Sequence, residues 1–177
     1  MDTDNPKYCV FCISGREQSV VQQIQKIDDH LAICPMIERH ESHKGTLETY
    51  QQVLFPGYIF LYTTGDLRKQ EILAIPSVLK FLTNDTGDPK LYGEDANFAD
   101  WLLTHNGIIG KSKAVREGDR IRVVDGPMKD FAGTITMVNK QRRRAKVDFV
   151  FQGIARSVWM AFDWVEPETQ DIEMVKA

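Results

Sequence analysis

The sequence predicts an α+β fold in which an N-terminal α/β sandwich is joined by a linker to a small all-β barrel. Up to residue 106, apolar runs of strand length alternate with segments of helical periodicity. Beyond residue 116, apolar and polar residues alternate with a period of two, as in short barrel strands. The segment between them has two glycines and no periodicity. We therefore expect an N-terminal domain over 1–106, a linker over 107–116, a barrel domain over 117–167 and a flexible tail over 168–177.

The N-terminal pattern predicts the element order β-α-β-β-β-α-β-α. The run from Lys7 to Ile13 has the aromatic and β-branched content of a strand. Ser14 and Glu17 have the spacing of a capping box, in which the Glu side chain reaches back to the N–H of the cap, and helical periodicity then continues to Leu31. Further strands are expected at 36–43 and 47–55, paired around Lys44-Gly45, and at 58–62 and 77–82, with helices from Asp66 to before Pro76 and over 94–106.

The C-terminal pattern predicts short strands spaced by roughly ten residues, an interval typical of a small barrel. Gly126-Pro127 is expected to form the first turn, since proline presets φ for the corner. Gly133 stands where a bulge would let a strand bend and close the barrel. The expected strands are 120–124, 134–138, 145–150, 155–160 and 162–165.

Charge is distributed unevenly along the chain. Residues 1–110 contain 9 Lys and Arg against 15 Asp and Glu, whereas residues 111–167 contain 12 against 7. This asymmetry favours different partners for the two parts, one of them a polyanion. The chain has no apolar run of about 18 residues and no secretory signal, and its three cysteines cannot form an even disulfide framework. We therefore expect a cytoplasmic protein.

Several motifs carry a resemblance that covers about residues 7–166. In order, they are Tyr8-Cys9-Val10, Ser14-Gly15-x-Glu17, Phe55-Pro56-Gly57-Tyr58-Ile59-Phe60 and Pro76-Ser77-Val78-x-x-Phe81. Together they resemble the N-terminal domain of the NusG transcription-factor family, the NGN domain. The stretch Gly118-Asp119-x-Ile121-x-Val123-x-x-Gly126-Pro127-Met128-x-x-Phe131-x-Gly133-x-Ile135 resembles the KOW motif, which completes the architecture of that family.

The resemblance implies a non-enzymatic, monomeric factor that travels with RNA polymerase and needs no cofactor. In the family, the NGN domain lays an apolar depression on the clamp helices of the largest polymerase subunit and thereby disfavours pausing. The KOW barrel recruits a ribosomal protein, a termination factor or nucleic acid. The residues assigned to the polymerase are Tyr8, Phe55, Gly57, Tyr58 and Phe81. All but Gly57, which lies in the same motif as Phe55 and Tyr58, are aromatic, and aromatic side chains dominate interfaces. The alternative is that these aromatics fill the core, above all Phe81 together with Phe60.

The basic residues of the C-terminal part favour contact with RNA. Guanidinium groups contact phosphates bidentately and stack on unpaired bases. The alternative is a solvated hairpin tip that is basic for solubility. The residues assigned to RNA are Lys111, Lys113, Arg116, Arg120, Arg122, Lys129, Lys140, Arg142, Arg143, Arg144, Lys146 and Arg156.

The segment from Phe151 to Met160 departs from the Gly-Arg-x-Thr-like turn that is usual before the fourth barrel strand of the family. Together with the excess of arginine, it favours a specialised antitermination paralog similar to LoaP, whose barrel recognises an RNA hairpin in the nascent leader. Two alternatives stay open. One is a housekeeping member that binds a ribosomal protein or termination factor, and the other is a stand-alone or ribosome-associated KOW protein that binds RNA.

Two other chemistries are disfavoured. Cys9, Cys12, His30 and Cys34 have the residue types of a zinc site, but an odd separation in a strand points Cys9 and Cys12 to opposite faces. We expect buried apolar cysteines and no metal. The histidines His40 and His43 lack a nearby nucleophile, and the segment 107–112 lacks the spacing of a phosphate-binding loop, so we expect no catalysis.

Overall fold

The computed structural model describes residues 5–43, 46–131 and 133–166. The expected turn at Lys44-Gly45 and the expected tail over 168–177 lie outside the described residues. The elements, in chain order, are β1 (Lys7–Cys12), α1 (Glu17–Ile24), β2 (His30–Ile33), β3 (Met36–His43), β4 (Thr46–Val53), β5 (Tyr58–Thr63), α2 (Lys69–Leu73), β6 (Val78–Phe81), α3 (Gly93–Thr104), β7 (Ile108–Ile109), β8 (Ser112–Glu117), β9 (Arg120–Asp125), β10 (Thr134–Asn139), β11 (Arg144–Phe151) and β12 (Ile154–Trp164).

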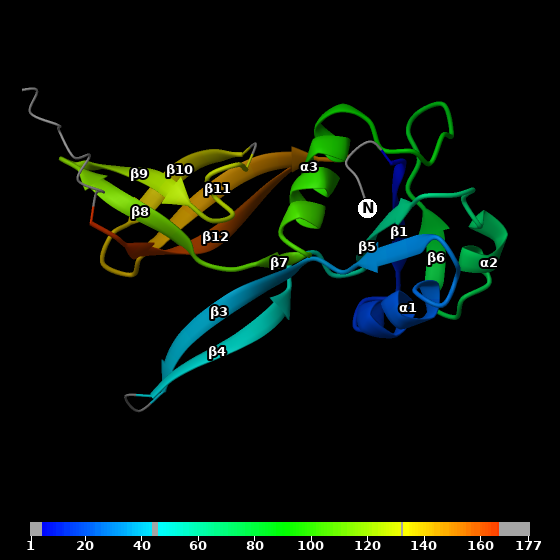
Figure 1. The fold of residues 1–177 in the computed structure, drawn as a ribbon, viewed down its shortest axis with the longest axis horizontal. Coiled ribbons are helices and arrows are strands. Elements are labelled where there is room, and N and C mark those ends of the chain that lie inside the picture. The colour runs from blue at the N-terminus through cyan, green and yellow to red at the C-terminus, as the bar shows by residue number, and fades with distance from the viewer. Residues whose placement is uncertain (1–4, 44–45, 132, 167–177) are drawn as a thin grey trace, which may run out of the picture.

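The N-terminal part is a layered α/β unit built on a four-stranded sheet of order β2-β5-β1-β6 (Figure 1). On one face, Val10 and Cys12 of β1 pack with Val20 and Ile24 of α1. On the other face, Cys9 and its neighbours pack with α3. The sheet separates these two clusters because successive side chains of a strand point to opposite faces. This is the layered arrangement that the sequence predicts.

The C-terminal part is an open five-stranded sheet, which we call the C-terminal sheet. Its order is β10-β11-β12-β8-β9, so β9 and β10 are the two edges and the described residues form no closed barrel. The predicted strands 155–160 and 162–165 are a single strand, β12, since Phe162 to Trp164 continue past β11 to pair in parallel with β8. The expectation of a closed barrel is therefore corrected to an open sheet in which the long strand β12 joins the β10-β11 pair to the β8-β9 pair.

The expected linker, 107–116, is largely ordered as strand. Ile108 and Ile109 form β7 beside β3, and Ser112 to Glu117 form β8 of the C-terminal sheet. Ile109, Ala114 and Val115 are buried. These three apolar side chains are therefore packed, whereas Ile108 stays exposed, and backbone groups of the segment pair with neighbouring strands.

Three further differences from the sequence-based expectation have local causes. The helix α1 ends at Ile24, and after a turn in which Asp29 adopts φ 63°, His30 to Ile33 form the unexpected strand β2 beside β5. The bulge expected near Gly133 lies instead between Ile135 and Met137. A Cβ at Gly133 would come within 2.7 Å of Val147, so glycine is needed there for close packing.

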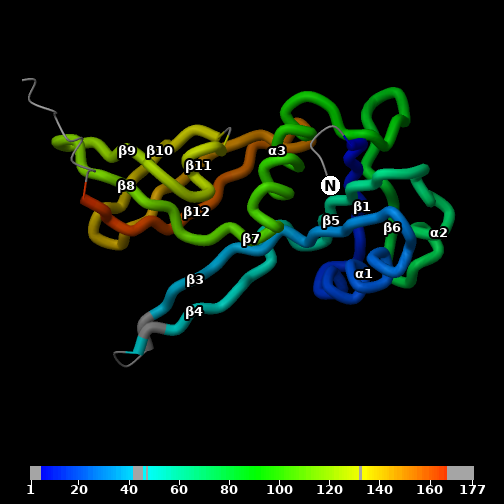
Figure 2. The backbone as a smooth tube through the Cα atoms, in the orientation of Figure 1, coloured from blue at the N-terminus to red at the C-terminus, as the bar shows by residue number. Residues whose placement is uncertain are grey.

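The strands β3 and β4 form a hairpin that extends away from both parts of the molecule (Figures 1 and 2). Its base pairs with β7 through the first residues of β3, and Arg39 and His40 of β3 form hydrogen bonds with the C-terminal sheet. No helix among the described residues is long and apolar enough to cross a membrane.

The three cysteines are buried and unpaired. Cys9 lies in the cluster facing α3 and Cys12 in the cluster facing α1, as the odd separation predicts. Burial raises the pKa of all three thiols. The pKa of Cys12 rises to about 11 and that of Cys34 to about 12. Within the described ranges, no three His, Cys, Asp or Glu side chains come together as metal ligands would.

These thiols should react slowly in the native protein. Burial raises the pKa of Cys12 from 9.0 to about 11. At any pH below 9, this lowers the fraction of Cys12 present as thiolate about 100-fold, and only the thiolate attacks a disulfide reagent. We expect Ellman's reagent at about pH 8 to label the native chain at least that much more slowly than the urea-unfolded chain. The free energy of unfolding should also fall as pH rises from about 9 towards 11, since only the unfolded thiols ionise there. Equal labelling rates in the two states would contradict this burial.

Candidate functional site

The turn between β4 and β5 is held to the start of α1 by one carboxylate. Glu17 is buried and accepts hydrogen bonds from the N–H of Gly15 at 2.8 Å and from the N–H of Gly57 at 2.8 Å. The expected capping box does not form, because the helix begins at Glu17 itself and has no side-chain cap. The Glu17 carboxylate instead binds the backbone of Gly15 and Gly57. Gly57 has φ 86°, and a Cβ there would lie 2.7 Å from the ring of Phe11, so only glycine fits.

This turn presents Phe55 and Tyr58 on the face of the sheet that carries α3. Their ring centroids are 6.4 Å apart, and Tyr58 also makes an edge contact with Phe11 at 5.2 Å. Phe98 of α3 lies beside Phe55, with 5.7 Å between the ring centroids. We call the surface formed by Phe11, Phe55, Tyr58 and Phe98 the aromatic face.

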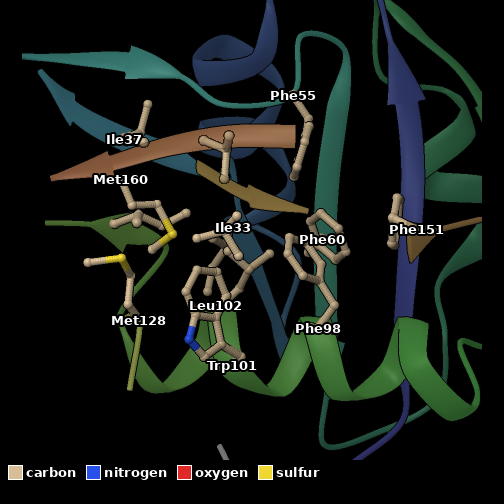
Figure 3. Close-up of a cluster of buried hydrophobic side chains, with 14 of the residues drawn as sticks. Ile33, Ile37, Phe55, Phe60, Phe98, Trp101, Leu102, Met128, Phe151 and Met160 are labelled. Carbon is tan, nitrogen blue, oxygen red and sulfur yellow. The ribbon is translucent and has the colours of Figure 1, made fainter. Parts of the chain in front are cut away.

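The C-terminal sheet lies directly on the aromatic face. Phe149 of β11 stacks on Phe98 with 5.3 Å between centroids, and Phe151 lies 5.2 Å from Phe60 and 6.0 Å from Tyr58. Figure 3 shows Phe55, Phe60, Phe98 and Phe151 within one cluster of buried side chains. As a result Phe55 is only 6% exposed, with side chains of the C-terminal sheet among its neighbours.

Arg156 of β12 completes the cover. Its guanidinium carbon lies 5.6 Å from the centroid of the Phe55 ring and 5.4 Å from that of Tyr58, and its Nη2 donates a hydrogen bond to the Tyr58 hydroxyl at 3.2 Å. A guanidinium over two aromatic rings is a favourable cation–π contact. Arg156, expected to contact RNA, is thus engaged by the aromatic face in this arrangement.

Hydrogen bonds at the rim join the same two parts. Gln152 donates to Asp95 from its backbone N–H at 2.9 Å and from its side-chain amide at 2.7 Å. Trp101 Nε1 donates to the carbonyl of Pro127 at 2.9 Å, and Trp101 and Met128 lie in the same buried cluster (Figure 3). At the hairpin, Arg144 donates to the carbonyl of His40 at 3.2 Å.

The five residues expected to bind the polymerase do not form one patch. Phe55, Gly57 and Tyr58 lie together at the aromatic face. Phe81 is 5% exposed and belongs to the cluster on the opposite side of the sheet, where Tyr8 also packs. The alternation of strand side chains explains this division, since Tyr8 points away from Cys9, which faces α3.

Most of the twelve expected RNA-contacting residues have partners within the chain. Ion pairs join Lys111 to Asp163 at 3.2 Å and Lys113 to Asp125 at 2.9 Å, and Arg122 pairs with Glu117. Arg116, Lys140, Arg144 and Arg156 make a hydrogen bond or a cation–π contact instead. The side chains with no ion pair, hydrogen bond or cation–π contact in the described part of the chain are Arg120, Lys129, Arg142 and Lys146.

Several basic residues lie in or beside the β8–β9 and β10–β11 turns of the C-terminal sheet. Lys140 Nζ donates to the carbonyl of Asp119 at 2.7 Å, which brings the β10–β11 turn beside the β8–β9 turn. Arg143 lies 3.6 Å from Asp163, and Arg116 lies over Trp164. We call this region the basic end; it contains Arg116, Arg120, Lys140, Arg142 and Arg143.

Comparison with known proteins agrees with this architecture. The family model described as transcription termination factor nusG matches residues 7–95. The chain belongs to the NusG family. It is 28% identical to the transcription termination/antitermination protein NusG of Thermus thermophilus, with 89% of this chain and 96% of the relative covered. The NusG of Rickettsia prowazekii is 27% identical, with 90% and 88% covered. Transcription termination and antitermination is therefore the functional class of this chain.

A solved structure described as "Domain interaction in Thermotoga maritima NusG" has a similar fold. It matches with a TM-score of 0.53 and 21% identity over 89% of this chain and 94% of that chain. At this identity the match supports the fold.

Sequence reasoning on this NusG-family chain finds Phe55, Gly57 and Tyr58 but misses the residues that surround them. Phe98, Phe149 and Phe151 fall in separate predicted elements, and no local pattern brings them together. In the folded chain these three phenylalanines and Arg156 converge on Phe55 and its neighbours. Their aromatic and cationic character is the only hint of this role in the sequence. The role of Glu17 in holding Gly57 is also missed, because the two are separated by 40 residues.

Replacement of Glu17 should loosen the turn of the NusG-family chain. A Glu17→Gln amide can accept only one of the two N–H bonds and places a donor against the other, so the free energy of unfolding should fall by about 1–3 kcal/mol. Urea denaturation measures this. Gln22→Ala, on an exposed position of the same helix, should change stability by less than about 0.5 kcal/mol. A Glu17→Gln variant as stable as the parent would show that the bond to Gly57 contributes nothing.

Proposed function

We propose that this NusG-family chain binds RNA polymerase through the aromatic face and promotes processive antitermination, with the basic end of the C-terminal sheet contacting nascent RNA. The observation that carries the proposal is the construction of the aromatic face. Glu17 holds the turn that presents Phe55 and Tyr58, while the groups that cover them, such as Phe151 and Arg156, come from the C-terminal sheet.

Aromatic side chains held rigidly on a surface are the residue type that supplies most binding energy at interfaces. The family resemblance assigns this surface to the clamp helices of the largest polymerase subunit. The C-terminal sheet and the clamp helices would then compete for the same side chains. Polymerase binding therefore requires the sheet to leave the aromatic face, and its affinity is lowered by the fraction of molecules in which the face is covered.

The remaining expected polymerase contacts take supporting roles in this proposal. Gly57 lets the turn approach Phe11 closely. Tyr8 and Phe81 fill the opposite side of the sheet and so fix the position of β1, on which Phe11 lies.

The departure of the segment from Phe151 to Met160 from the usual family pattern supports a specialised paralog similar to LoaP. Phe151 and Arg156, both within this segment, cover the aromatic face together with Phe149, which precedes the segment. The unusual segment therefore has a role in closing the molecule. Release of the sheet would free Arg156 from Tyr58, so that this side chain, at the end of β12 opposite the basic end, could contact RNA separately.

A housekeeping role, with a ribosomal protein or termination factor as partner, is the second candidate. The exposed side chains of Ile135 and Met137, 38% and 56% accessible, lie on the edge strand β10. An edge strand with apolar side chains can accept a strand or loop of another protein. In vitro transcription across a terminator distinguishes the two, because read-through that depends on a leader hairpin supports the RNA partner.

Changes to the aromatic face and to its cover should shift polymerase binding in opposite directions. Tyr58→Ala should weaken binding of the full chain to the polymerase about tenfold or more, as loss of an interface anchor does. Gln152→Ala, which removes the amide bond to Asp95, should strengthen it about threefold to tenfold because the cover is released more often. Binding is measured by titration of the labelled chain with core polymerase.

The control for these variants is Tyr92→Ala, since Tyr92 is exposed just before α3 and its side chain contacts Asp88 by a hydrogen bond and Lys90 by a cation–π interaction. Its affinity should match that of the parent. If Tyr58→Ala bound the polymerase as well as the parent does, the assignment of the aromatic face would be wrong.

Removal of charge at the basic end should weaken RNA binding in a salt-dependent way. The double variant Arg120→Ser/Arg142→Ser should reduce the slope of log affinity against log salt by about 1.4, about 0.7 for each lost phosphate contact to a single strand. The measurement is fluorescence anisotropy with a short RNA hairpin. Lys26→Ser/Lys80→Ser removes two exposed charges from the N-terminal part and should leave the slope unchanged. Identical slopes for the two variants would rule out the basic end as the RNA site.

A further inference from the structure

A cleft of about 530 Å³ lies between α3 and the C-terminal sheet, beside the aromatic face, with which it shares Phe98. Helix α3 forms one wall with Phe98 and Trp101, and Phe131 and Phe149 form the other. The volume falls in the range of small-molecule sites, which lie preferentially between domains. Because its walls come from both parts of the chain, the cleft exists only while the C-terminal sheet is docked.

The walls of the cleft are aromatic and already rigid. Trp101 and Phe131 have 4.4 Å between ring centroids, Phe131 and Phe149 have 5.2 Å, and Phe98 stacks on Phe149. Trp101 is further fixed by its hydrogen bond to Pro127. Because these rings already hold one another in place, a ligand that contacts them would cause little further loss of side-chain freedom.

The rim of the cleft is acidic. Glu94 of α3, Asp130 of the β9–β10 connection and Asp148 of β11 line it, and its described lining includes no lysine or arginine. Asp148 accepts a bond from Ser157, whereas Glu94 and Asp130 have no ion pair within the described residues. Arg156, next to the lining residue Ala155, is turned to the other side and contacts Tyr58.

From this geometry we infer that the cleft binds a small organic cation, a protonated amine or guanidinium carried on an aromatic or aliphatic body. The body would lie among the aromatic rings, and the cation would lie at the rim between carboxylates on both parts of the chain. Aromatic faces and carboxylates both attract such a group, and both would repel an anion. Occupation of the cleft joins α3 to the C-terminal sheet and stabilises the docked arrangement.

The binding test uses the full chain and 2-phenylethylamine as the probe, with 2-phenylethanol as its neutral counterpart and 3-phenylpropionate as its anionic one. Trp101 lines the cleft, so the change in tryptophan fluorescence reports binding, and ligand-observed NMR confirms it. We expect a dissociation constant on the order of 1 mM for the amine, and at least about tenfold weaker binding of the other two. Equal binding of the alcohol, or no binding of the amine, would overturn the inference.

The variant test removes two of the three carboxylates of the acidic rim without touching the aromatic walls. Glu94→Gln/Asp130→Asn should weaken the amine about threefold to tenfold and leave the alcohol unaffected, since both side chains are exposed and lie outside the core. The matched control Asp66→Asn/Asp85→Asn makes the same change in net charge at exposed positions elsewhere and should bind as the parent does. Equal loss in both variants would reduce the effect to overall charge and refute the site.

The coupling of the cleft to polymerase binding rests on the proposed function and is measured separately. At an amine concentration ten times its dissociation constant, the docked form gains about tenfold over the released form. The apparent affinity for polymerase should then fall by up to about tenfold, and the Glu94→Gln/Asp130→Asn variant should lose this effect. Amine binding with unchanged polymerase affinity would refute the coupling while leaving the cleft site intact.

Discussion

The packing of β11 against α3 is the interaction on which the rest of this structure depends. Phe149 and Phe151 of β11 reach Phe98 of α3 and continue to Phe55 and Phe60, so that a single buried cluster crosses from the N-terminal part to the C-terminal sheet. Burial of aromatic side chains contributes about 2–3 kcal/mol for each ring that is fully removed from water. A contact of this size holds two parts together and is still small enough for a competing partner to replace.

The aromatic face and the side chains that cover it come from different parts of the chain. The bonds from Gly15 and Gly57 to Glu17 fix the turn whether or not the C-terminal sheet is present, because all three residues belong to the N-terminal part. The aromatic face is thus formed before it is covered. Its cover, by contrast, depends on a few side chains of β11 and β12. In the function proposed above, binding of the polymerase and closure of the molecule would be alternatives that use the same aromatic rings.

The sequence predicted the fold best where local periodicity is strong. The strand at Lys7, the hairpin of β3 and β4, and α3 all follow from spacing alone. The short strand β2 was hidden because Leu31 continues the helical spacing of α1, while Asp29 turns the chain before it. The order within 107–116 was missed because its strands are stabilised by distant partners on β3 and β12, which no local pattern records.

The candidate site was predicted in part for a similar reason. Phe55, Gly57 and Tyr58 occur together in one short motif, so the motif located them. Tyr8 and Phe81 lie far apart in the sequence, and which side of the sheet they face depends on strand register, which places them opposite Phe55. The engagement of Arg156 with Tyr58 joins residues 98 positions apart and could be seen only in the folded chain.

The C-terminal sheet covers the aromatic face in the free chain and, in the function proposed above, leaves it when polymerase binds. Double electron–electron resonance measures the distance between two nitroxide labels and tests this most directly. The labels are attached at Gln22→Cys in α1 and Gln141→Cys at the β10–β11 turn, since both positions are exposed and the native cysteines are buried. We expect one narrow distance in the free chain and a longer, broader distribution with saturating polymerase. An unchanged distance in the complex would contradict release of the sheet.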